Sequence, residues 1–262
     1  MLTEEELKRY ERQLMIRGIG ESGQERLKRA RVVIGGAGGL GTPAAMYLAA
    51  AGVGTIRIID SEQVDISNLN RQVLHWTKDL GRSKLDSLGE KLRQLNEQVE
   101  IEGISEPISE DNACRLTSGF DVILDGTDDL ATRFLLNSAA LKNGITFVHG
   151  AVFGFEGRVT TIIPGRTPCL GCLYRGITPQ QKIPMIGVAA AVVGSLQATE
   201  AIKYILGIGH LLANQLLVYN GFKMRFTTLA IKRDPACRQC GAPKAGTYEH
   251  QDTHPDILSF RI

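Results

Sequence analysis

Excess charge of one sign and long apolar runs are both missing from this sequence. Its 262 residues carry 30 Lys and Arg against 28 Asp and Glu, and a net charge of +2 is too small to indicate a nucleic acid partner. The longest apolar run, residues 186–196, contains two glycines and is much shorter than the roughly 18 residues of a membrane span. The charged first residues lack the apolar core of a secretory signal. We therefore expect a cytoplasmic protein with no membrane partner.

Cysteine is scarce, and its distribution is uneven. Four of the five cysteines form two Cys-x-x-Cys pairs, Cys169 with Cys172 and Cys237 with Cys240. In a chain of this length the pairs predict a closed four-thiolate zinc site rather than disulfides. Unligated buried thiols and a redox pair are the alternatives; neither pair follows a strand as in a thioredoxin-like unit. The fifth, Cys114, is expected to be a small buried core residue on a helix.

Short apolar runs alternate with helical patterns over the first 150 residues. This alternation predicts an α/β fold with a doubly wound, mostly parallel Rossmann-like sheet. Strands are expected at 31–34, 55–60, 99–101, 121–124 and 146–148, with helices at 42–51, 83–96 and 131–143. After residue 150, β-rich segments at 158–163, 216–219 and 224–229 predict antiparallel strands that extend the sheet, with a long helix at 189–206.

A glycine-rich loop follows the first predicted strand and opens a helix. Its glycines are Gly36, Gly38, Gly39 and Gly41, and Asp60 follows 19 residues later. Glycines let the backbone approach a phosphate, and the helix N-terminus offers N–H groups to the anion. The loop alone predicts an adenine nucleotide site. It leaves open a dinucleotide oxidoreductase and a packing turn without a ligand.

Further polar residues follow the other strands at the sheet edge where ligands bind in such folds. A nicotinamide enzyme does not need this much charge, whereas a reaction at an α-phosphate does, because negative charge grows on its oxygens. Taken singly, each basic residue is an ordinary surface charge. The residues are Asn68, Arg71 and Gln72 after the second strand, Lys84 at a helix start, Asp128 after the fourth strand, and Arg12 near the N-terminus.

Six motifs in this order resemble the ubiquitin-activating-enzyme superfamily, most closely the bacterial molybdopterin-synthase and thiamine-biosynthesis adenylyltransferases. The resemblance runs from Arg9 to about Gly241. The motifs are Arg9-Tyr-x-Arg-Gln, the glycine loop, Ser67-Asn-Leu-x-Arg-Gln72, Leu80-Gly-x-x-Lys84, Asp125-x-Thr-Asp128 and the two cysteine pairs.

The resemblance implies a reaction and a role for each motif residue. The chain is expected to use ATP to activate the C-terminal glycine carboxylate of a ubiquitin-like sulfur-carrier protein ending in Gly-Gly, for molybdopterin or thiamine biosynthesis. The implied roles are ribose binding by Asp60, triphosphate binding by Asn68, Arg71 and Lys84, magnesium binding by Asp128, and a contact by Arg12 across a homodimer interface.

The whole chain is expected to be one adenylation domain. Its parts are a helical segment (1–30), the nucleotide-binding part (31–150), a part with antiparallel strands, crossover loop and zinc ligands (151–246), and a polar tail (247–262). On the helix that follows Asp128, Arg133 and Asn137 are expected to face the site, and Asp125 is expected to be a structural turn or capping residue.

Two positions depart from the family pattern. Asp129 stands where the family has asparagine, and the sequence has no cysteine between Cys172 and Cys237 to accept the activated carrier. An external sulfur donor is therefore expected. Three alternatives stay open: the same fold adenylating a modified tRNA base or a peptide terminus, a dinucleotide oxidoreductase, and a non-catalytic scaffold.

Overall fold

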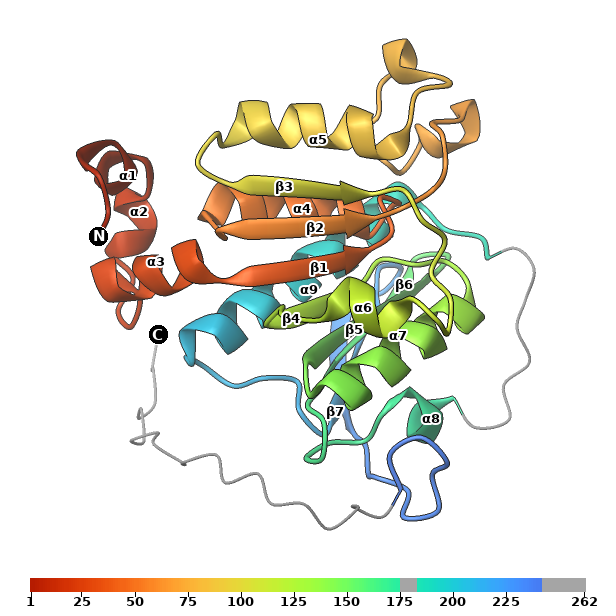
Figure 1. Cartoon of the computed structure of the whole chain (residues 1–262). Coiled ribbons are helices and arrows are strands. Elements are labelled where there is room, and N and C mark those ends of the chain that lie inside the picture. Colours follow the sequence, from red (N-terminus) through yellow and green to blue (C-terminus); the bar gives the residue numbers. More distant parts are fainter. Residues whose placement is uncertain (175–182, 242–262) are drawn as a thin grey trace.

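The computed structural model describes residues 1–174 and 183–241 (Figure 1). The predicted tail (247–262) and residues 175–182 of the predicted crossover loop lie outside the described residues. Within the described part, one eight-stranded sheet has the order β3-β2-β1-β4-β5-β6-β7-β8. No helix in that part combines the length and the apolar character needed to cross a membrane.

Five strands form the parallel part of the sheet. They are β1 (Arg31–Gly35), β2 (Thr55–Ile59), β3 (Glu100–Ile104), β4 (Val122–Asp125) and β5 (Thr146–Phe153). The chain moves outward from β1 to β2 and β3, then returns to place β4 on the other side of β1. The carboxyl ends of β1 and β4 therefore border the crevice where such sheets bind ligands. This arrangement confirms the predicted doubly wound sheet.

The antiparallel extension is also confirmed, and it begins earlier than predicted. Strand β6 (Glu156–Ile162) folds back on β5, and β7 (Gln215–Asn220) and β8 (Arg225–Ala230) complete the sheet. Strand β5 continues past Gly150, where the sequence suggested an end. The added length of β5 pairs with β6, from Gly150 opposite Val159 to Phe153 opposite Glu156. A Cβ at position 150 would lie only 2.5 Å from Cδ of Gln197, so this position of the strand requires glycine.

Helices cover both faces of the sheet. In β1, Val32 and Ile34 pack with α4 (Gly41–Ala51), α5 (Lys84–Leu95) and α9 (Gly187–Leu206). The intervening Val33 faces the opposite side, towards α6 (Ala113–Thr117) and α7 (Leu130–Asn143). Because successive side chains of a strand point to opposite faces, an unbroken apolar run is what a strand between two helix layers requires. Figure 1 shows the two helix layers.

The N-terminal segment is helical, as expected, and forms three helices. They are α1 (Glu4–Arg9), α2 (Glu11–Leu14) and α3 (Gly20–Arg29). The Tyr10 hydroxyl accepts a hydrogen bond from Asn96, just after α5, and Gln13 donates to the carbonyl of Ala51, the last residue of α4. These helices end at the amino edge of the sheet, so the segment lies across the sheet from the carboxyl edge (Figure 1).

The glycine loop offers a matched pair of substitutions. A Cβ at Gly41 would lie 1.9 Å from the Gly36 carbonyl oxygen, whereas one at Gly38 would meet nothing closer than 3.7 Å. We expect Gly41→Ala to lower the free energy of unfolding by about 3 kcal/mol or more, because backbone cannot yield to overpacking as a side chain can. Gly38→Ala should melt like the unsubstituted protein. Equal melting temperatures for the two variants in thermal denaturation would contradict this packing.

Candidate active site

A cavity of about 220 Å³ opens at the carboxyl edge of the parallel strands. It is bounded by the glycine loop, the ends of β2 and β4, the segment between β2 and α5, and the start of α7. Eight of the residues expected to bind nucleotide line it: Gly36, Gly38, Gly39, Asp60, Arg71, Gln72, Lys84 and Asp128. Segments from four places in the sequence thus meet at one cavity.

The glycine loop forms the inner wall of this cavity. Gly36 has a φ of +100°, which glycine adopts without strain, and its N–H donates to the Ile59 carbonyl at 2.8 Å. Gly41 does not line the cavity; its role is the close packing described above. The loop leads directly into α4, whose N-terminal N–H groups carry partial positive charge.

Asp60 holds the glycine loop against the second strand. One carboxylate oxygen accepts from the Ala37 N–H and the other from the Glu62 N–H, each at 2.8 Å. Both bonds are backbone contacts, so the carboxylate is fixed in place at the cavity wall. It keeps further lone pairs with which to accept hydroxyl hydrogens.

The segment after β2 carries the residues of the Ser67–Gln72 motif. Asn68 ends a short 3₁₀ helix, η1 (Ile66–Asn68), and its Oδ1 accepts from the Asp65 N–H at 3.0 Å; it does not line the cavity. Arg71 does, and donates to the Ser67 carbonyl at 2.7 Å. Gln72 is 3% exposed, and its Oε1 is a buried acceptor with no partner among the described residues.

Lys84 is a buried charged residue, although a single lysine in a sequence is ordinarily a surface charge. Ser83 caps α5 by accepting from Leu85 N–H, and this places Lys84 in the first turn. The Lys84 side chain is 4% exposed, and its ammonium donates to the Glu62 carboxylate at 2.5 Å. Glu62 is 72% exposed, so the ammonium is held at the cavity by a partner that can move into solvent.

Three acidic residues lie at the end of β4 or just after it, and they differ in whether they make structural hydrogen bonds. Asp125 is fully buried and accepts from the Thr127 N–H and hydroxyl, as expected of a structural turn residue. Asp129 caps α7 by accepting from the Thr132 N–H at 2.8 Å, a role that an asparagine also fills. Asp128 is exposed and lines the cavity. Of these three carboxylates, that of Asp128 has no structural bond among the described contacts.

Arg133 lines the cavity, as expected, but Asn137 does not. Arg133 donates to the Thr127 carbonyl at 2.7 Å, and its buried Nε makes no hydrogen bond among the described residues but lies 3.6 Å from Oδ2 of Asp125 as an ion pair. One helical turn later, Asn137 accepts from the Leu170 N–H and donates to the side chain of Gln239, at the cysteine cluster. The expectation that Asn137 faces the cavity is therefore wrong.

A buried chain of hydrogen bonds behind the cavity has no sequence motif. His149 on β5 donates from Nδ1 to Asp125 at 2.6 Å and accepts at Nε2 from the Tyr174 hydroxyl at 2.7 Å. Burial lowers the pKa of His149, and Arg133 adds to this effect, so the imidazole is neutral. Burial opposes ionisation of Asp125, but Arg133 and His149 outweigh it and hold the pKa of that carboxyl below its usual range. A lone histidine in an apolar strand gives no signal that distinguishes it from a core residue.

The four paired cysteines gather into one cluster. Cys169 precedes a short helix, α8 (Leu170–Leu173), and Cys237 and Cys240 lie after β8. All four Sγ atoms lie within 4.8 Å of one another, with 3.6 Å between Cys169 and Cys237 and 3.4 Å between Cys172 and Cys240. Four sulfurs at 2.3 Å from a tetrahedral zinc stand about 3.8 Å apart. The donor set therefore fits a closed zinc site and is too widely spaced for disulfides.

The thiols differ in acidity. Burial raises the pKa of Cys169, and Cys240 raises it further. Burial also acts on Cys237, but the backbone N–H groups of Cys240 and Gln239 outweigh it and lower the pKa to about 7. Metal binding by these residues must therefore release protons.

Cys114 and Arg12 both lie away from the cavity. Cys114 is half-buried on α6 and belongs to neither core cluster, so the expectation of a core residue is wrong. Arg12 is exposed on α2, in the segment at the amino edge of the sheet, and does not line the cavity of its own chain.

The fold and the site together define a class: doubly wound nucleotide-binding proteins with an appended four-thiolate cluster. Within that class the chain belongs to the ThiF family, whose pattern matches residues 10–239. It is 41% identical to the sulfur carrier protein adenylyltransferase of Thermus thermophilus, with 91% of this chain and 92% of that protein covered. It is 42% identical to the probable adenylyltransferase/sulfurtransferase MoeZ of Mycobacterium tuberculosis, with 90% of this chain covered but only 62% of that longer protein.

Solved structures with the same fold are more distant in sequence. Escherichia coli MccB with MccA-N7isoASN superposes with a TM-score of 0.81 at 22% identity, covering 90% of this chain and 75% of that one. PaaA superposes with a TM-score of 0.77 at 24% identity, covering 88% of this chain and 84% of that one. At this identity the likeness shows the shared fold.

The cysteine geometry predicts one zinc per chain. We expect elemental analysis of freshly purified protein to find it, and Cys172→Ser to lose it and unfold at a lower temperature, because a structural metal contributes binding energy to folding. Cys114→Ser is the matched control and should keep both zinc and melting temperature. Well under one zinc per chain in the unsubstituted protein would exclude the metal site.

Proposed function

We propose that this protein is an adenylyltransferase that uses ATP to activate the C-terminal glycine carboxylate of a ubiquitin-like sulfur-carrier protein. The observation that carries the proposal is the buried Lys84, held at the same cavity as the glycine loop and Arg71. A relative that is named sulfur carrier protein adenylyltransferase, and that matches this chain over nearly its full length, supports the choice of substrate.

The reaction joins the carrier's carboxylate to the α-phosphorus of ATP. The carboxylate oxygen attacks, the bond from the α-phosphorus to the bridging oxygen breaks, and the products are an acyl-adenylate and pyrophosphate. A carboxylate needs no general base, so the chain's task is to place the reactants and to neutralise growing negative charge. Basic side chains and helix N–H groups around one small cavity suit that task.

The proposed roles follow from the contacts already described. The loop glycines and the start of α4 hold phosphates, and Asp60 and Gln72 accept from the ribose. Lys84 and Arg71 neutralise the phosphates once Glu62 turns to solvent, since that carboxylate is 72% exposed. Asn68 has its amide nitrogen to offer to a phosphate, while its Oδ1 accepts from the Asp65 N–H in the turn.

Magnesium and zinc have separate places in the proposal. Asp128 would hold magnesium, because its exposed carboxylate lines the cavity without a structural bond among the described contacts, and Mg²⁺ prefers oxygen ligands. Bound Mg²⁺ neutralises phosphate charge. Zinc at the four cysteines would be structural, because four thiolates leave no open position. Four reduced thiols also agree with a cytoplasmic location.

Two partners complete the proposal. An external sulfur donor is needed, since no thiol lies between Cys172 and Cys237 to take the activated carrier. A second copy of the chain is proposed as well: Arg12 lies across the sheet from its own cavity, and a homodimer can bring it to the partner's cavity. The geometry does not favour an oxidoreductase, because hydride transfer leaves Arg71, Lys84 and Asp128 unexplained.

Exchange of labelled pyrophosphate into ATP tests the reaction. We expect exchange that requires magnesium and one Gly-Gly carrier, and that is lost when the carrier's last glycine is deleted, because the attacking carboxylate is then misplaced. Folded, zinc-loaded protein that binds ATP but gives no exchange with any ubiquitin-like carrier would refute the proposed substrate.

A mixture of two variants tests the roles of Lys84 and Arg12 together. Lys84→Ala and Arg12→Ala should each slow exchange about 100-fold, the usual cost of removing one well-placed charge donor. Lys142→Ala, at the exposed end of α7, is the control and should have no effect. If Arg12 acts in the partner's site, equal mixing restores about a quarter of the activity, because half of the dimers then hold one intact site. No recovery after subunit exchange would place Arg12 outside the partner's site.

A further inference from the structure

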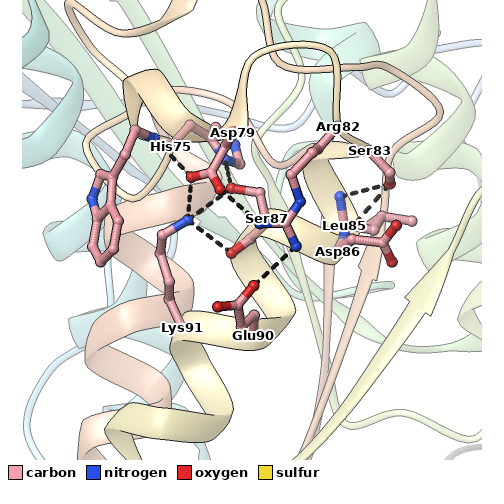
Figure 2. A network of polar contacts seen from close by, with 10 residues as sticks. His75, Asp79, Arg82, Ser83, Leu85, Asp86, Ser87, Glu90 and Lys91 are labelled. Atoms are coloured by element: carbon pink, nitrogen blue, oxygen red, sulfur yellow. Dashed lines mark hydrogen bonds and ion pairs between the residues drawn. The ribbon is translucent and has the colours of Figure 1, made fainter.

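A buried polar network lies beside the cavity without lining it (Figure 2). Its members come from the segment before α5 and from α5 itself. Their exposed fractions are 0% for Asp79, 0% for Ser87, 2% for His75 and 7% for Lys91. Buried ion pairs add little to stability compared with apolar residues of similar size, so this network calls for a reason other than stability.

Asp79 is the fixed point of the network. It lies at the end of a short 3₁₀ helix, η2 (Thr77–Asp79), and accepts from the Trp76 N–H at 2.9 Å and from Arg82 at 2.8 Å. The Lys91 ammonium donates to it at 2.5 Å. Burial opposes ionisation of Asp79, but these donors, Lys91 foremost, hold the pKa of its carboxyl far below the usual range. The carboxylate therefore stays charged and keeps Lys91 in place.

From Lys91 the network continues to His75. The Lys91 ammonium donates to the Ser87 hydroxyl oxygen at 2.9 Å, and that hydroxyl lies 2.9 Å from Nδ1 of His75. Ser87 and Lys91 are one turn apart on the same face of α5, and Figure 2 shows the Lys91 ammonium directed at Asp79 and Ser87. With its oxygen occupied by Lys91, the Ser87 hydroxyl has its hydrogen to give to Nδ1.

The other ring nitrogen of His75 reaches the glycine loop. Nε2 lies 3.1 Å from the Ala37 carbonyl oxygen. A carbonyl can only accept, so Nε2 carries the hydrogen and Nδ1 is the acceptor. Burial lowers the pKa of His75, and Lys84 and Lys91 lower it further, against the bond to Ala37. A neutral imidazole with its hydrogen on Nε2 satisfies both contacts of the ring, with Ser87 and with Ala37.

This bond fixes one peptide plane of the loop. In a trans peptide the carbonyl of residue 37 and the N–H of residue 38 point in opposite directions. Holding the Ala37 carbonyl inward at His75 therefore holds the Gly38 N–H outward, and Gly38 lines the cavity. The Ala37 N–H is held by Asp60 at 2.8 Å. The flanking glycines resist rotation very little, so these two bonds supply the rigidity.

We propose that His75 is a positioning residue for nucleotide phosphates: it orients the Gly38 amide through the Ala37 carbonyl, and Asp79, Lys91 and Ser87 hold its ring in place. The inference rests on the proposed function, since it assumes that phosphates bind at the loop. Because Ser87 and Lys91 share α5 with Lys84, the same network also fixes the spacing between the loop and the Lys84 ammonium.

Two amide substitutions separate positioning from packing. In His75→Gln the amide nitrogen is as many bonds from Cβ as Nε2 is, so it still reaches the Ala37 carbonyl. In His75→Asn the amide matches Nδ1, so it meets Ser87 but not Ala37. Dissociation constants for a non-hydrolysable ATP analogue with magnesium, and for adenosine as the phosphate-free control, are measured by calorimetry without any carrier.

We expect His75→Asn to weaken binding of the ATP analogue at least tenfold and of adenosine less than twofold, and His75→Gln to stay within threefold of the unsubstituted protein for both. Three results each overturn the inference: unchanged ATP affinity in His75→Asn, equal losses in the two variants, or a parallel loss of adenosine. If His75→Asn does not fold, Ser87→Ala takes its place, with an expected threefold loss confined to the ATP analogue; an unchanged ATP affinity there is equally decisive.

The readout is independent of the adenylation reaction. An unsubstituted protein that binds the ATP analogue but exchanges no pyrophosphate would refute the proposed function and leave the role of His75 open to the same measurement. An unsubstituted protein that binds no nucleotide would overturn both.

Discussion

Three stretches of backbone meet at the carboxyl edge of the sheet with no side chain between them. A Cβ at Gly126 would lie within about 3 Å of the carbonyls of Gly35 and Gly36, and one at Gly41 would overlap the Gly36 carbonyl. The turn after β1, the start of α4 and the turn after β4 can therefore touch. This contact brings Asp128 and Arg133 to the same cavity as the glycine loop. Every arrangement of charge around the cavity depends on it.

The charged residues at this edge differ in how easily solvent can displace their partners. Asp125 is enclosed by Thr127, His149 and Arg133 and cannot exchange them for solvent. The Lys84 ammonium has as its carboxylate partner an exposed glutamate, Glu62. A buried ion pair is expensive to break, whereas a pair with one exposed partner costs little to separate. The structural carboxylate Asp125 thus keeps its partners, whereas the Lys84 ammonium at the cavity remains available to a ligand.

Residues that belong to a short motif could be predicted from the sequence. Residues whose role depends on packing between distant elements could not. The glycine loop, Arg71, Lys84 and Asp128 reach one cavity because each follows a strand or opens a helix, and strand ends meet at one edge. His149 and His75 carry no such mark: both are single histidines whose partners, Asp125 and Ala37, come from other elements. The length of β5 depends on its pairing with β6, and Gly150 leaves room for Gln197, 47 residues further on, a contact that no local pattern contains.

One turn of α7 connects the cysteine cluster with the cavity. Arg133 in α7 lies at the cavity, and Asn137, one turn later, bonds to Leu170 and Gln239 beside the thiols. A second connection starts at Tyr174, two residues after Cys172. Its hydroxyl bonds to His149, which in turn bonds to Asp125. A closed four-thiolate metal site takes no part in chemistry, but here it would set the position of α8 against α7. Through this turn of helix and the buried imidazole, a bound metal would hold the cavity wall in place.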